Sequence, residues 1–402
     1  MVASKKQNKK KYDVIIIGGL GHVGLPLGLA LAEKGLKVCL HDKDTKNAEL
    51  VRKGIMPFIE YEAEPILEKL VKKKDALTFS SDVREVSQAR YVVIAIGTPV
   101  DEYLNPNVRV FLEFFEGLKK HLNKNQTIII RSTIYPRTCQ QIMKILGRDM
   151  QLSYCPERIA QGYAIRELKE LPQLVAGVTV KAQNSAAKLF SLIAPKVLKT
   201  SMEKAELAKL FSNAWRYIQF SVANQFYMIA SDFNLDFNDI RRVMVDGYGR
   251  AANMPSAGFA AGPCLLKDTM QLAAFNNNNF FLGHAAMMVN EGLPNFIVEN
   301  IRKRHGDIGK KKIGILGMTF KADIDDIRDS LSYKLGKILR FHGATVFYSD
   351  EYAKDSSFVS KQQLVKACDI VIIGVPHSAY AKLKIPKKVE LIDMWPIVNR
   401  AK

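Results

Sequence analysis

Short apolar runs alternate with amphipathic segments in the first part of the chain. The stretch YDVIIIGGLGHVGLPLGLALAEKGLKVCLHD begins with a continuous apolar run, passes through glycines, continues at helical spacing and ends in a second apolar run closed by Asp42. This pattern predicts a strand, a helix and a second strand. Further strands are predicted at YVVIAIGTP, where Thr98 and Pro99 end the run, and at QTIIIRSTIYP and QLSYCPERI. Strands that alternate with helices indicate a parallel sheet covered on both faces.

The pattern changes from about Ser201. The stretch MEKAELAKLFSNAWRYIQFSVANQFYMIASDF is rich in helix formers and contains no glycine or proline, which predicts one extended helix. Helical signals continue to about Arg304, interrupted by a stretch with Gly and Pro around Cys264.

The last part of the chain repeats the pattern of the first. KKKIGILGMTFKADIDDIRDSLSYKLGKILRFHGATVFYSD again predicts strand, loop, helix and strand and ends on Asp350, and ACDIVIIGVPHSAY and VELIDMW supply later strands. We therefore predict an α/β fold of two Rossmann-like, doubly wound parallel-sheet domains joined by a helical region with a long central helix. The expected divisions are residues 1–198, 199–304 and 305–402. Two such sheets suggest two nucleotide-like ligands.

Composition narrows the class of protein. With 402 residues, 25% charged and 48% hydrophobic, the chain is typical of a soluble globular protein, and no apolar run reaches the length of a membrane-crossing helix. The opening MVASKKQNKKK lacks the apolar core of a signal peptide, so we interpret it as a solvated tail. The five cysteines are scattered, which favours neither a disulfide framework nor a metal site and suits a reducing cytoplasm. We expect a cytoplasmic protein without membrane insertion.

The strong positive charge raises the question of a nucleic-acid partner. The formal net charge is +19 and the pI about 9.5. Much of the excess lies in runs such as KKQNKKK, VKKKD and GKKKIG, which lack the interleaved aromatic residues of a base-stacking surface. A basic field also attracts a charged nucleotide ligand, and we expect no specific binding of nucleic acid.

A glycine motif follows the first predicted strand. Gly19, Gly21 and Gly24 form GxGxxG at the start of a predicted helix, and Asp42 follows 18 residues after Gly24. The glycines allow a tight turn and close approach of a pyrophosphate to the helix N-terminus, and the aspartate suits a ribose diol. The motif therefore predicts dinucleotide binding, and the acidic residue favours NAD over NADP.

A second candidate site surrounds Cys264 in GFAAGPCLLKDT. If a helix begins near Cys264, then Cys264, Lys267 and Asp268 lie on one face; the alternative is a buried structural cysteine. In the long helix, Lys209 and Asn213 are one turn apart, although most such lysines are simply solvated. TFKADIDDIRDS offers Lys321 and Arg328 either for capping and surface ion pairs or for a diphosphate or uracil site.

These segments, in this order, are similar to the UDP-glucose/GDP-mannose dehydrogenase family over nearly the whole chain. The matching motifs are GGLGHVGLP, GTPVD, STIYP, CPERIAQG, AELAKLFSNAW, GFAAGPCLLKDT, VNEGLP and LGMTFKADIDDIRDS. The resemblance implies an NAD-binding domain, a central helical dimerisation region and a nucleotide-sugar-binding domain. It also implies an NAD-dependent enzyme that oxidises the C6 alcohol of a UDP-sugar to a carboxylate, in the synthesis of surface polysaccharide precursors.

The resemblance assigns the site residues by motif position. As catalytic residues it implies Cys264, Lys209, Asn213, Asp268, Glu157 and Thr133. For the cofactor it implies Gly19, Gly21, His22, Val23, Gly24, Asp42, Thr98, Thr133 and Lys267. For the substrate it implies Glu157, Arg158, Lys209, Asn213, Arg250, Gly258, Phe259, Phe320 and Lys321. No metal is expected. The resemblance implies a homo-oligomer, most simply a dimer formed through the long central helix.

The chemistry explains these residue types. Two successive oxidations at one carbon need a thiolate that holds the aldehyde as a thiohemiacetal and then as a thioester. A helix N-terminus and a nearby lysine favour the thiolate of Cys264. Lys209 and Asn213 would stabilise oxyanions. Asp268, through a water held with Thr133, would move the alcohol proton, and Glu157 would assist thioester hydrolysis.

Several positions depart from the family pattern. Ala260 and Ala261 interrupt the glycine-rich loop before the cysteine, Arg137 stands at a usual glycine position, and Trp395 stands where many relatives carry arginine. The CPERIAQG motif favours a UDP-N-acetylhexosamine as substrate over UDP-glucose. Two different hypotheses stay open beside this one. The first is a single-step hydroxyacid-type dehydrogenase, which has no need of Cys264, and the second is an NAD- and nucleotide-sugar-binding protein without turnover.

Overall fold

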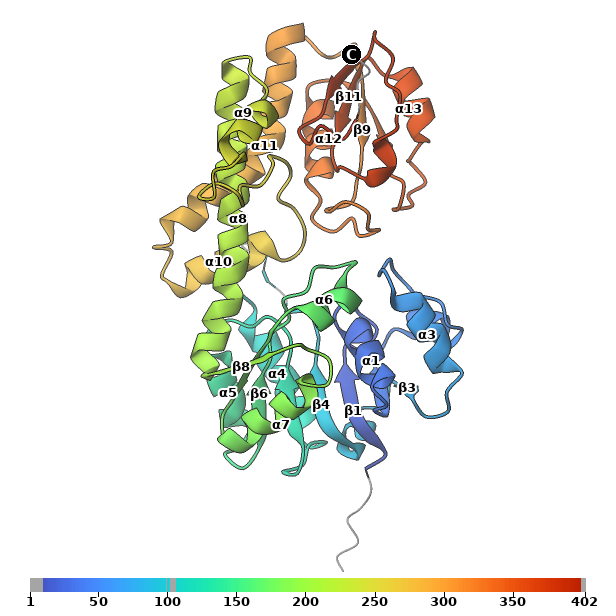
Figure 1. Cartoon of the computed structure of the whole chain (residues 1–402), viewed down its shortest axis with the longest axis vertical. Coiled ribbons are helices and arrows are strands. Elements are labelled where there is room, and N and C mark those ends of the chain that lie inside the picture. Colours follow the sequence, from blue (N-terminus) through green and yellow to red (C-terminus); the bar gives the residue numbers. More distant parts are fainter. Residues whose placement is uncertain (1–9, 99, 102–105, 399–402) are drawn as a thin grey trace, which may run out of the picture. The chain divides into compact units, whose positions relative to one another are not determined.

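The computed structural model describes residues 10–98, 100–101 and 106–398. Residues 1–9 and Pro99 lie outside this part of the chain, and with them most of the expected solvated tail and the expected end of a strand at Pro99. The chain divides into two compact units, Met1–Leu210 and Phe211–Lys402, with the boundary inside one long helix. Each unit is described by itself, with the element labels of Figure 1.

Within the described residues of the first unit, eight strands form one sheet in the order β3-β2-β1-β4-β5-β6-β7-β8. The strands are β1 (Tyr12–Ile17), β2 (Val38–His41), β3 (Leu77–Ser80), β4 (Ala89–Ile94), β5 (Thr127–Ile130), β6 (Gln151–Tyr154), β7 (Gln173–Gly177) and β8 (Val197–Thr200). The first six strands have the order of a dinucleotide-binding sheet, whose ligand crevice lies where the order reverses, at the carboxyl ends of β1 and β4. The predicted strands are confirmed at all five sequence segments, whereas β3, β7 and β8 carry too weak a pattern to have been predicted.

The sheet departs from the expected all-parallel arrangement at one place. β6 and β7 pair antiparallel, Ser153 opposite Gly177 and Tyr154 opposite Ala176, while the other pairs of this sheet are parallel. The reason is the short connection through helix α6, which returns the chain alongside β6 in the opposite direction.

Helices cover both faces of this sheet, as the alternation predicts. They are α1 (Gly24–Glu33), α2 (Thr45–Arg52), α3 (Ala63–Val71), the 3₁₀ turn η1 (Val83–Gln88), α4 (Val108–Lys119), α5 (Thr138–Leu146), α6 (Ala164–Glu170) and α7 (Val180–Phe190). Alternate residues of β1 enter different cores: Val14 and Ile16 pack with α1, α3 and α7, and Ile15 and Ile17 pack with α4 and α5. Two buried faces explain why the strands are continuously apolar.

The second unit begins with helices. They are α8 (Met202–Asp232), which starts in the first unit, α9 (Phe237–Val245), α10 (Leu265–Phe275) and α11 (Phe281–His305). The long helix is thus confirmed as one element of 31 residues. It packs against α11 through an edge-on pair of rings, Tyr227 and Phe296, and a hydrogen bond from Asn300 to Ser231. None of the helices in the described ranges is long and apolar enough to cross a membrane.

The second unit ends in a smaller parallel sheet, whose order in the described residues is β10-β9-β11-β12. Its elements are β9 (Lys312–Leu316), α12 (Leu331–Phe341), β10 (Thr345–Ser349), α13 (Lys361–Ala367), β11 (Ile370–Ile373), the 3₁₀ turn η2 (Ser378–Tyr380) and β12 (Glu390–Ile392). Helices α11 and α12 share a core with one face of the sheet, and α13 covers the other. The predicted repeat of strand, loop, helix and strand is confirmed.

Candidate active site

The glycine loop after β1 is shaped by close contacts on three of its glycines. Gly18 has a φ of +78°, and a Cβ there would lie 2.6 Å from the carbonyl oxygen of Ala95. A Cβ on Gly19 would lie 2.8 Å from the Ile16 carbonyl oxygen, and one on Gly24 would lie 2.1 Å from that of Gly18. Gly21 differs, because a Cβ there would meet nothing closer than 3.7 Å. Gly21 therefore leaves its backbone open at the place where a pyrophosphate approaches in this motif.

Asp42 ties this loop to the end of β2. One carboxylate oxygen accepts a hydrogen bond from the Leu20 amide at 3.1 Å, and the other accepts from the amides of Lys43 and Asp44. His22 packs on Phe58, with 3.9 Å between the ring centroids, and Val23 is the residue before α1. Thr98 lies beyond the end of β4, on the other side of the crevice. The open Gly21, the first turn of α1 and the half-buried Asp42 fit an NAD dinucleotide.

Cys264 stands at the N-cap of α10, as predicted from the proline before it. The helix begins at Leu265, and the Asp268 amide donates to the Cys264 carbonyl at 2.9 Å. Cys264 is exposed, whereas Cys39, Cys139, Cys155 and Cys368 are buried. Burial raises the pKa of the Cys39 and Cys368 thiols to about 11 and that of Cys155 to about 12, and it raises the pKa of Cys139 well above its usual range. Cys264 is thus the accessible thiol of the described cysteines.

Two helices of the second unit meet at a buried carboxylate one turn after the cysteine. Asn213 Nδ2 of α8 donates to Asp268 Oδ2 of α10 at 2.6 Å, and the two residues are 7% and 1% exposed. Lys267 Nζ lies 3.9 Å from the other oxygen of Asp268. Lys209 is one turn before Asn213 on α8 and is also buried. A buried carboxylate beside an amide and an ammonium can hold or move a proton.

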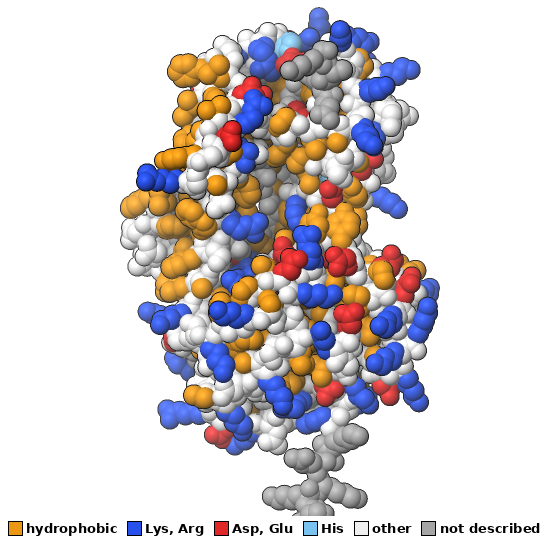
Figure 2. All heavy atoms as spheres, in the orientation of Figure 1, with side chains coloured by type: hydrophobic (Ala, Val, Ile, Leu, Met, Phe, Trp, Pro, Cys, Tyr) orange, Lys and Arg blue, Asp and Glu red, His pale blue; other side chains and the backbone are white. Residues whose placement is uncertain are grey.

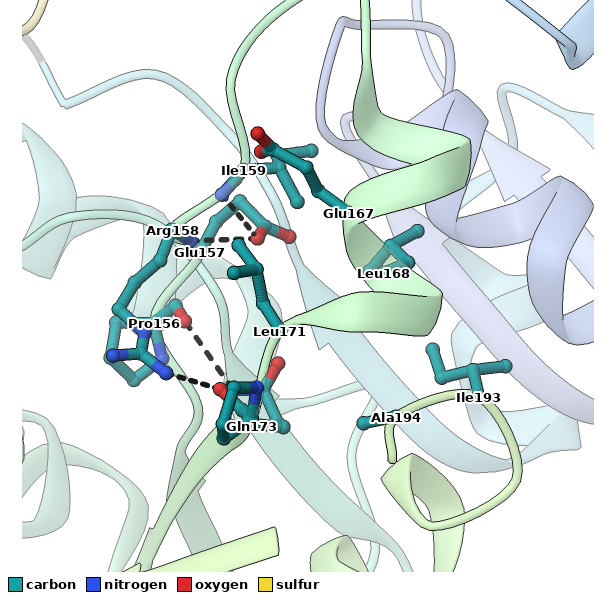
Figure 3. A pocket seen from close by; sticks show the side chains of 11 residues that line it. Pro156, Glu157, Arg158, Ile159, Glu167, Leu168, Leu171, Gln173, Ile193 and Ala194 are labelled. Carbon is teal, nitrogen blue, oxygen red and sulfur yellow. Dashed lines mark hydrogen bonds between the residues drawn. The ribbon is translucent and has the colours of Figure 1, made fainter. Parts of the chain in front are cut away.

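Glu157 is engaged in a buried ion pair of the first unit. One oxygen accepts from the Arg131 guanidinium, and the other accepts from the amides of Arg158 and Ile159 at 2.7 and 3.0 Å. The Arg158 guanidinium donates to the Pro172 carbonyl. Figure 3 shows this loop beside a cavity of about 10 Å³, which has room for one water and not for a sugar. Thr133 is half-buried in the loop after β5.

Apart from Asn213 of α8, the predicted substrate residues of the second unit lie on two loops. Phe320 and Lys321 follow β9, in a loop fixed by the buried side chain of Asp350 at the end of β10. Gly258 and Phe259 precede the cysteine, and Arg250 is exposed after α9. The two loops touch, because a Cβ on Gly262 would lie 2.5 Å from the Phe320 ring. The structure thus joins the cysteine loop to the loop after β9.

The comparisons with known proteins cover these same segments. Three domain models of the UDP-glucose/GDP-mannose dehydrogenase family match the chain: the NAD binding domain at residues 13–194, the central domain at 203–291 and the UDP binding domain at 314–400. The chain belongs to the UDP-glucose/GDP-mannose dehydrogenase family. It is an NAD-dependent nucleotide-sugar dehydrogenase, an oxidoreductase, as the sequence predicted.

Individual members of the family match over nearly the full length. A UDP-N-acetyl-D-mannosamine dehydrogenase of Methanocaldococcus jannaschii is 26% identical over 96% of this chain and 93% of its own. Two solved structures match with a TM-score of 0.86: a UDP-D-ManNAc dehydrogenase from Pyrococcus horikoshii, 24% identical over 96% of both chains, and a UDP-glucose dehydrogenase from Pyrobaculum islandicum, 22% identical over 96% of this chain and 95% of its own. The structural matches establish the family fold.

Some residues of this family member were not predicted from its sequence. Asn224 and Asn290 are fully buried beside the cysteine loop, Arg131 is the buried partner of Glu157, and His377 is the buried partner of Asp350. Asn224 carried a usable signal, because it lies 11 residues after Asn213 and therefore on the same side of α8. No group of acidic, histidine and cysteine residues that could hold a metal ion occurs in the described segments.

Proposed function

We propose that this chain oxidises the C6 alcohol of a UDP-N-acetylhexosamine to the uronate in two steps through Cys264. The observation that carries the proposal is the exposed thiol at the N-cap of α10 with the buried Asn213–Asp268 pair one turn further on. A single-step hydroxyacid-type dehydrogenase, or a binding protein without turnover, has no use for this thiol.

The residues of the chain supply the covalent chemistry. NAD, when bound, accepts the hydride in each of the two oxidations. Asp268, with a water held by Thr133, takes the proton of the C6 hydroxyl in the first oxidation. The Cys264 thiolate then forms a C–S bond to the aldehyde carbon, and Lys209 and Asn213 stabilise the resulting oxyanion.

The second oxidation leaves a thioester on Cys264. Water adds to its carbonyl carbon with help from Glu157, the C–S bond breaks, and Cys264 leaves as the thiolate. In total, one alcohol, one water and two oxidised NAD give one carboxylate, two NADH and three protons.

The binding roles follow the placement of the residues. Gly19, Gly21, His22, Val23, Gly24, Asp42 and Thr98, with Thr133 and Lys267, would hold NAD. Glu157, Arg158, Lys209, Asn213, Arg250, Gly258, Phe259, Phe320 and Lys321 would hold the UDP-sugar. The UDP binding domain model at residues 314–400 supports a UDP-sugar, and the relative named as a UDP-N-acetyl-D-mannosamine dehydrogenase supports an N-acetylhexosamine. UDP-glucose is the alternative, favoured by the fold match to a UDP-glucose dehydrogenase.

The division of the chain into residues 1–198, 199–304 and 305–402 and its place in the cytoplasm remain predictions. The three family models, which match at 13–194, 203–291 and 314–400, support the division.

We also propose a homodimer formed through α8. Phe233, directly after the end of α8, is 73% exposed, and five apolar residues of the helix itself are 40 to 61% exposed: Phe211, Trp215, Val222, Phe226 and Ile229. At 100° per residue they occupy an arc of about 60°, which is the narrow seam of paired helices. Lys209 and Asn213 lie on the opposite side of α8. Figure 2 shows hydrophobic side chains gathered along the left side of the helical region. A second copy presenting the same seam would bury the exposed apolar residues of α8.

The dimer is tested by mass. Phe226→Glu places a charge in the seam and should convert a particle of twice 45.1 kDa to the monomer in light scattering after gel filtration. Val180→Glu, at a site 74% exposed on α7, is the matched control and should leave the mass unchanged. A monomeric wild-type protein would contradict the proposal.

The oxidation is tested by stoichiometry. Limiting UDP-N-acetylmannosamine, UDP-N-acetylglucosamine, UDP-N-acetylgalactosamine and UDP-glucose are supplied singly, and NADH is followed at its absorbance band. We expect two NADH per sugar with one N-acetylhexosamine, and loss of uronate with Cys264→Ser. One NADH per sugar, unchanged in the variant, would exclude the thioester route.

A further inference from the structure

A buried asparagine forms two hydrogen bonds with the backbone where the cysteine loop begins. The Gly258 amide donates to Asn224 Oδ1 at 2.8 Å, and Asn224 Nδ2 donates to the Gly258 carbonyl at 3.0 Å. The second hydrogen of Asn224 Nδ2 goes to Asn290 Oδ1 at 2.9 Å, and Asn290 Nδ2 donates to the Tyr217 carbonyl at 3.0 Å. Both asparagines are fully buried. A buried polar chain satisfied in this way fixes its members in one arrangement.

Trp395 covers the other side of the same glycine. A Cβ on Gly258 would lie 2.1 Å from Cζ2 of the indole and 2.5 Å from its Nε1. The indole also meets the Phe259 ring edge-on, with 6.4 Å between centroids. Gly258 has a φ of +150°, in a region of backbone space that is nearly restricted to glycine. Gly258 is thus held between Asn224 of α8 and Trp395, which follows β12.

The loop is held a second time just before the cysteine. The Gly262 amide donates to the Asp329 carbonyl at 3.3 Å, and the glycine packs on the Phe320 ring at a φ of +99°. Gly258 and Gly262 are both fixed, so few conformations remain for the residues between them and for Cys264 at the start of α10. A loop without these contacts loses this order, because each freed residue gains conformational entropy.

We propose that Asn224 and Trp395 are positioning residues of Cys264: by holding Gly258 they keep the thiol at the first turn of α10. The proposal rests on the function proposed for Cys264. The helix N-terminus favours a thiolate only within its first turn, so a shift of the loop weakens the thiol as a nucleophile. The indole of Trp395 also links the cysteine loop to residues 314–400, the segment that matches the UDP binding domain model and contains the smaller sheet.

Alkylation of Cys264 tests this without any substrate. Iodoacetamide modifies the exposed Cys264 while the buried cysteines stay protected, and mass spectrometry follows the rate at pH 7. We expect Asn224→Ala and Trp395→Ala to slow the alkylation at least about five-fold, and Trp395→Phe, which retains a ring, to slow it less. The matched control is Asn300→Ala, which also removes an asparagine bond between α11 and α8 but does not touch the loop; its rate should match wild type.

Two further measurements distinguish a positioning role of Asn224 and Trp395 from a general loss of stability in the variants. In the wild-type protein, the Gly258 amide should exchange its hydrogen far more slowly than the amides of exposed loops, because Asn224 holds it. In steady-state kinetics, the Asn224 and Trp395 variants should lose kcat and keep the KM for NAD.

An unchanged or faster alkylation rate in both alanine variants, or fast exchange at Gly258 in wild type, would overturn the positioning role. The two-step oxidation through Cys264 is tested separately: full uronate formation by Cys264→Ser would contradict it. That outcome would not change the alkylation rates.

Discussion

Asn213 Nδ2 lies 2.6 Å from Asp268 Oδ2, and this bond joins α8 to α10 one turn beyond Cys264. An amide N–H can only donate, so Asp268 Oδ2 is the acceptor of this bond. The same amide is the group that we assign to the oxyanion. We therefore propose two tasks for the pair: Asp268 accepts a proton, and the Asn213 amide offers a hydrogen-bond donor to a developing negative charge.

Replacing Asn213 by aspartate should inactivate the enzyme and make its activity depend on pH. Asn213→Asp puts two carboxylates where one now accepts a bond, and we expect kcat to fall at least about 100-fold at pH 8. Acidification should recover part of the loss, because the two carboxylates can then share a proton. The measurement is kcat against pH for wild type, Asn213→Asp and Asn213→Ala.

The matched control is Asn184→Asp, at an exposed asparagine of α7 that bonds to Lys199. It should leave the pH profile unchanged. Near-normal turnover by Asn213→Asp at all pH values would show that the bond has no catalytic role.

Glu157 should contribute to the stability of the fold as well as to the proposed hydrolysis. Its partner Arg131 is fully buried and also donates to the Cys155 carbonyl and to Gln173. Glu157→Gln leaves the buried guanidinium without its counter-charge, which costs about 3 kcal/mol of unfolding free energy. Urea unfolding measures this loss.

A double variant separates the two roles. Glu157→Gln combined with Arg131→Met removes both charges and should be more stable than the sum of the single losses predicts. If stability returns and uronate formation does not, Glu157 has a chemical role. Glu113→Gln breaks the exposed pair with Arg109 and is the control without effect.

Asp350 should make the second unit sensitive to acid. Burial by itself would raise the pKa of this carboxyl, but the hydrogen bond and attraction of His377, and the amides of Ala353 and Met318, outweigh it and lower the pKa. A carboxyl with a lowered pKa in the folded state contributes stability above its unfolded pKa, about 4, and loses it as pH falls further.

Urea midpoints between pH 6 and pH 2.5 measure this contribution. Asp350→Asn should cost about 2–3 kcal/mol at pH 6, and its difference from wild type should shrink below pH 4. A difference that stays constant across this range would contradict the assignment.

The sequence predicted the fold well because the fold depends on local pattern. Continuous apolar strands, the glycine motif and the glycine-free long helix each specify their element within a few residues of chain. The start of α10 at Leu265 followed from Pro263 in the same way.

The rest depends on contacts between distant segments. β7 pairs antiparallel to β6, Glu157 meets Arg131 across 26 residues, and Trp395 packs on Gly258. No local periodicity carries such information, because each of these residues has an ordinary neighbourhood in sequence. The sequence showed Trp395 as a departure from the family pattern, and the structure shows which glycine it covers.

Arg137 offers a test of another such departure. It stands before α5 with a φ of +69°, in the left-handed region that disfavours residues with a Cβ, and its amide donates to the buried Glu206 at 2.7 Å. Arg137→Gly removes the Cβ and retains this bond, so we expect a gain of about 1 kcal/mol and a melting temperature about 2–4 °C higher. Arg137→Ala removes the same side chain but keeps the Cβ, and should give no gain. An equal gain in stability in both variants would trace the effect to the charge of Arg137. A gain in stability in Arg137→Gly alone would show that Glu206 holds a strained turn at the start of α5.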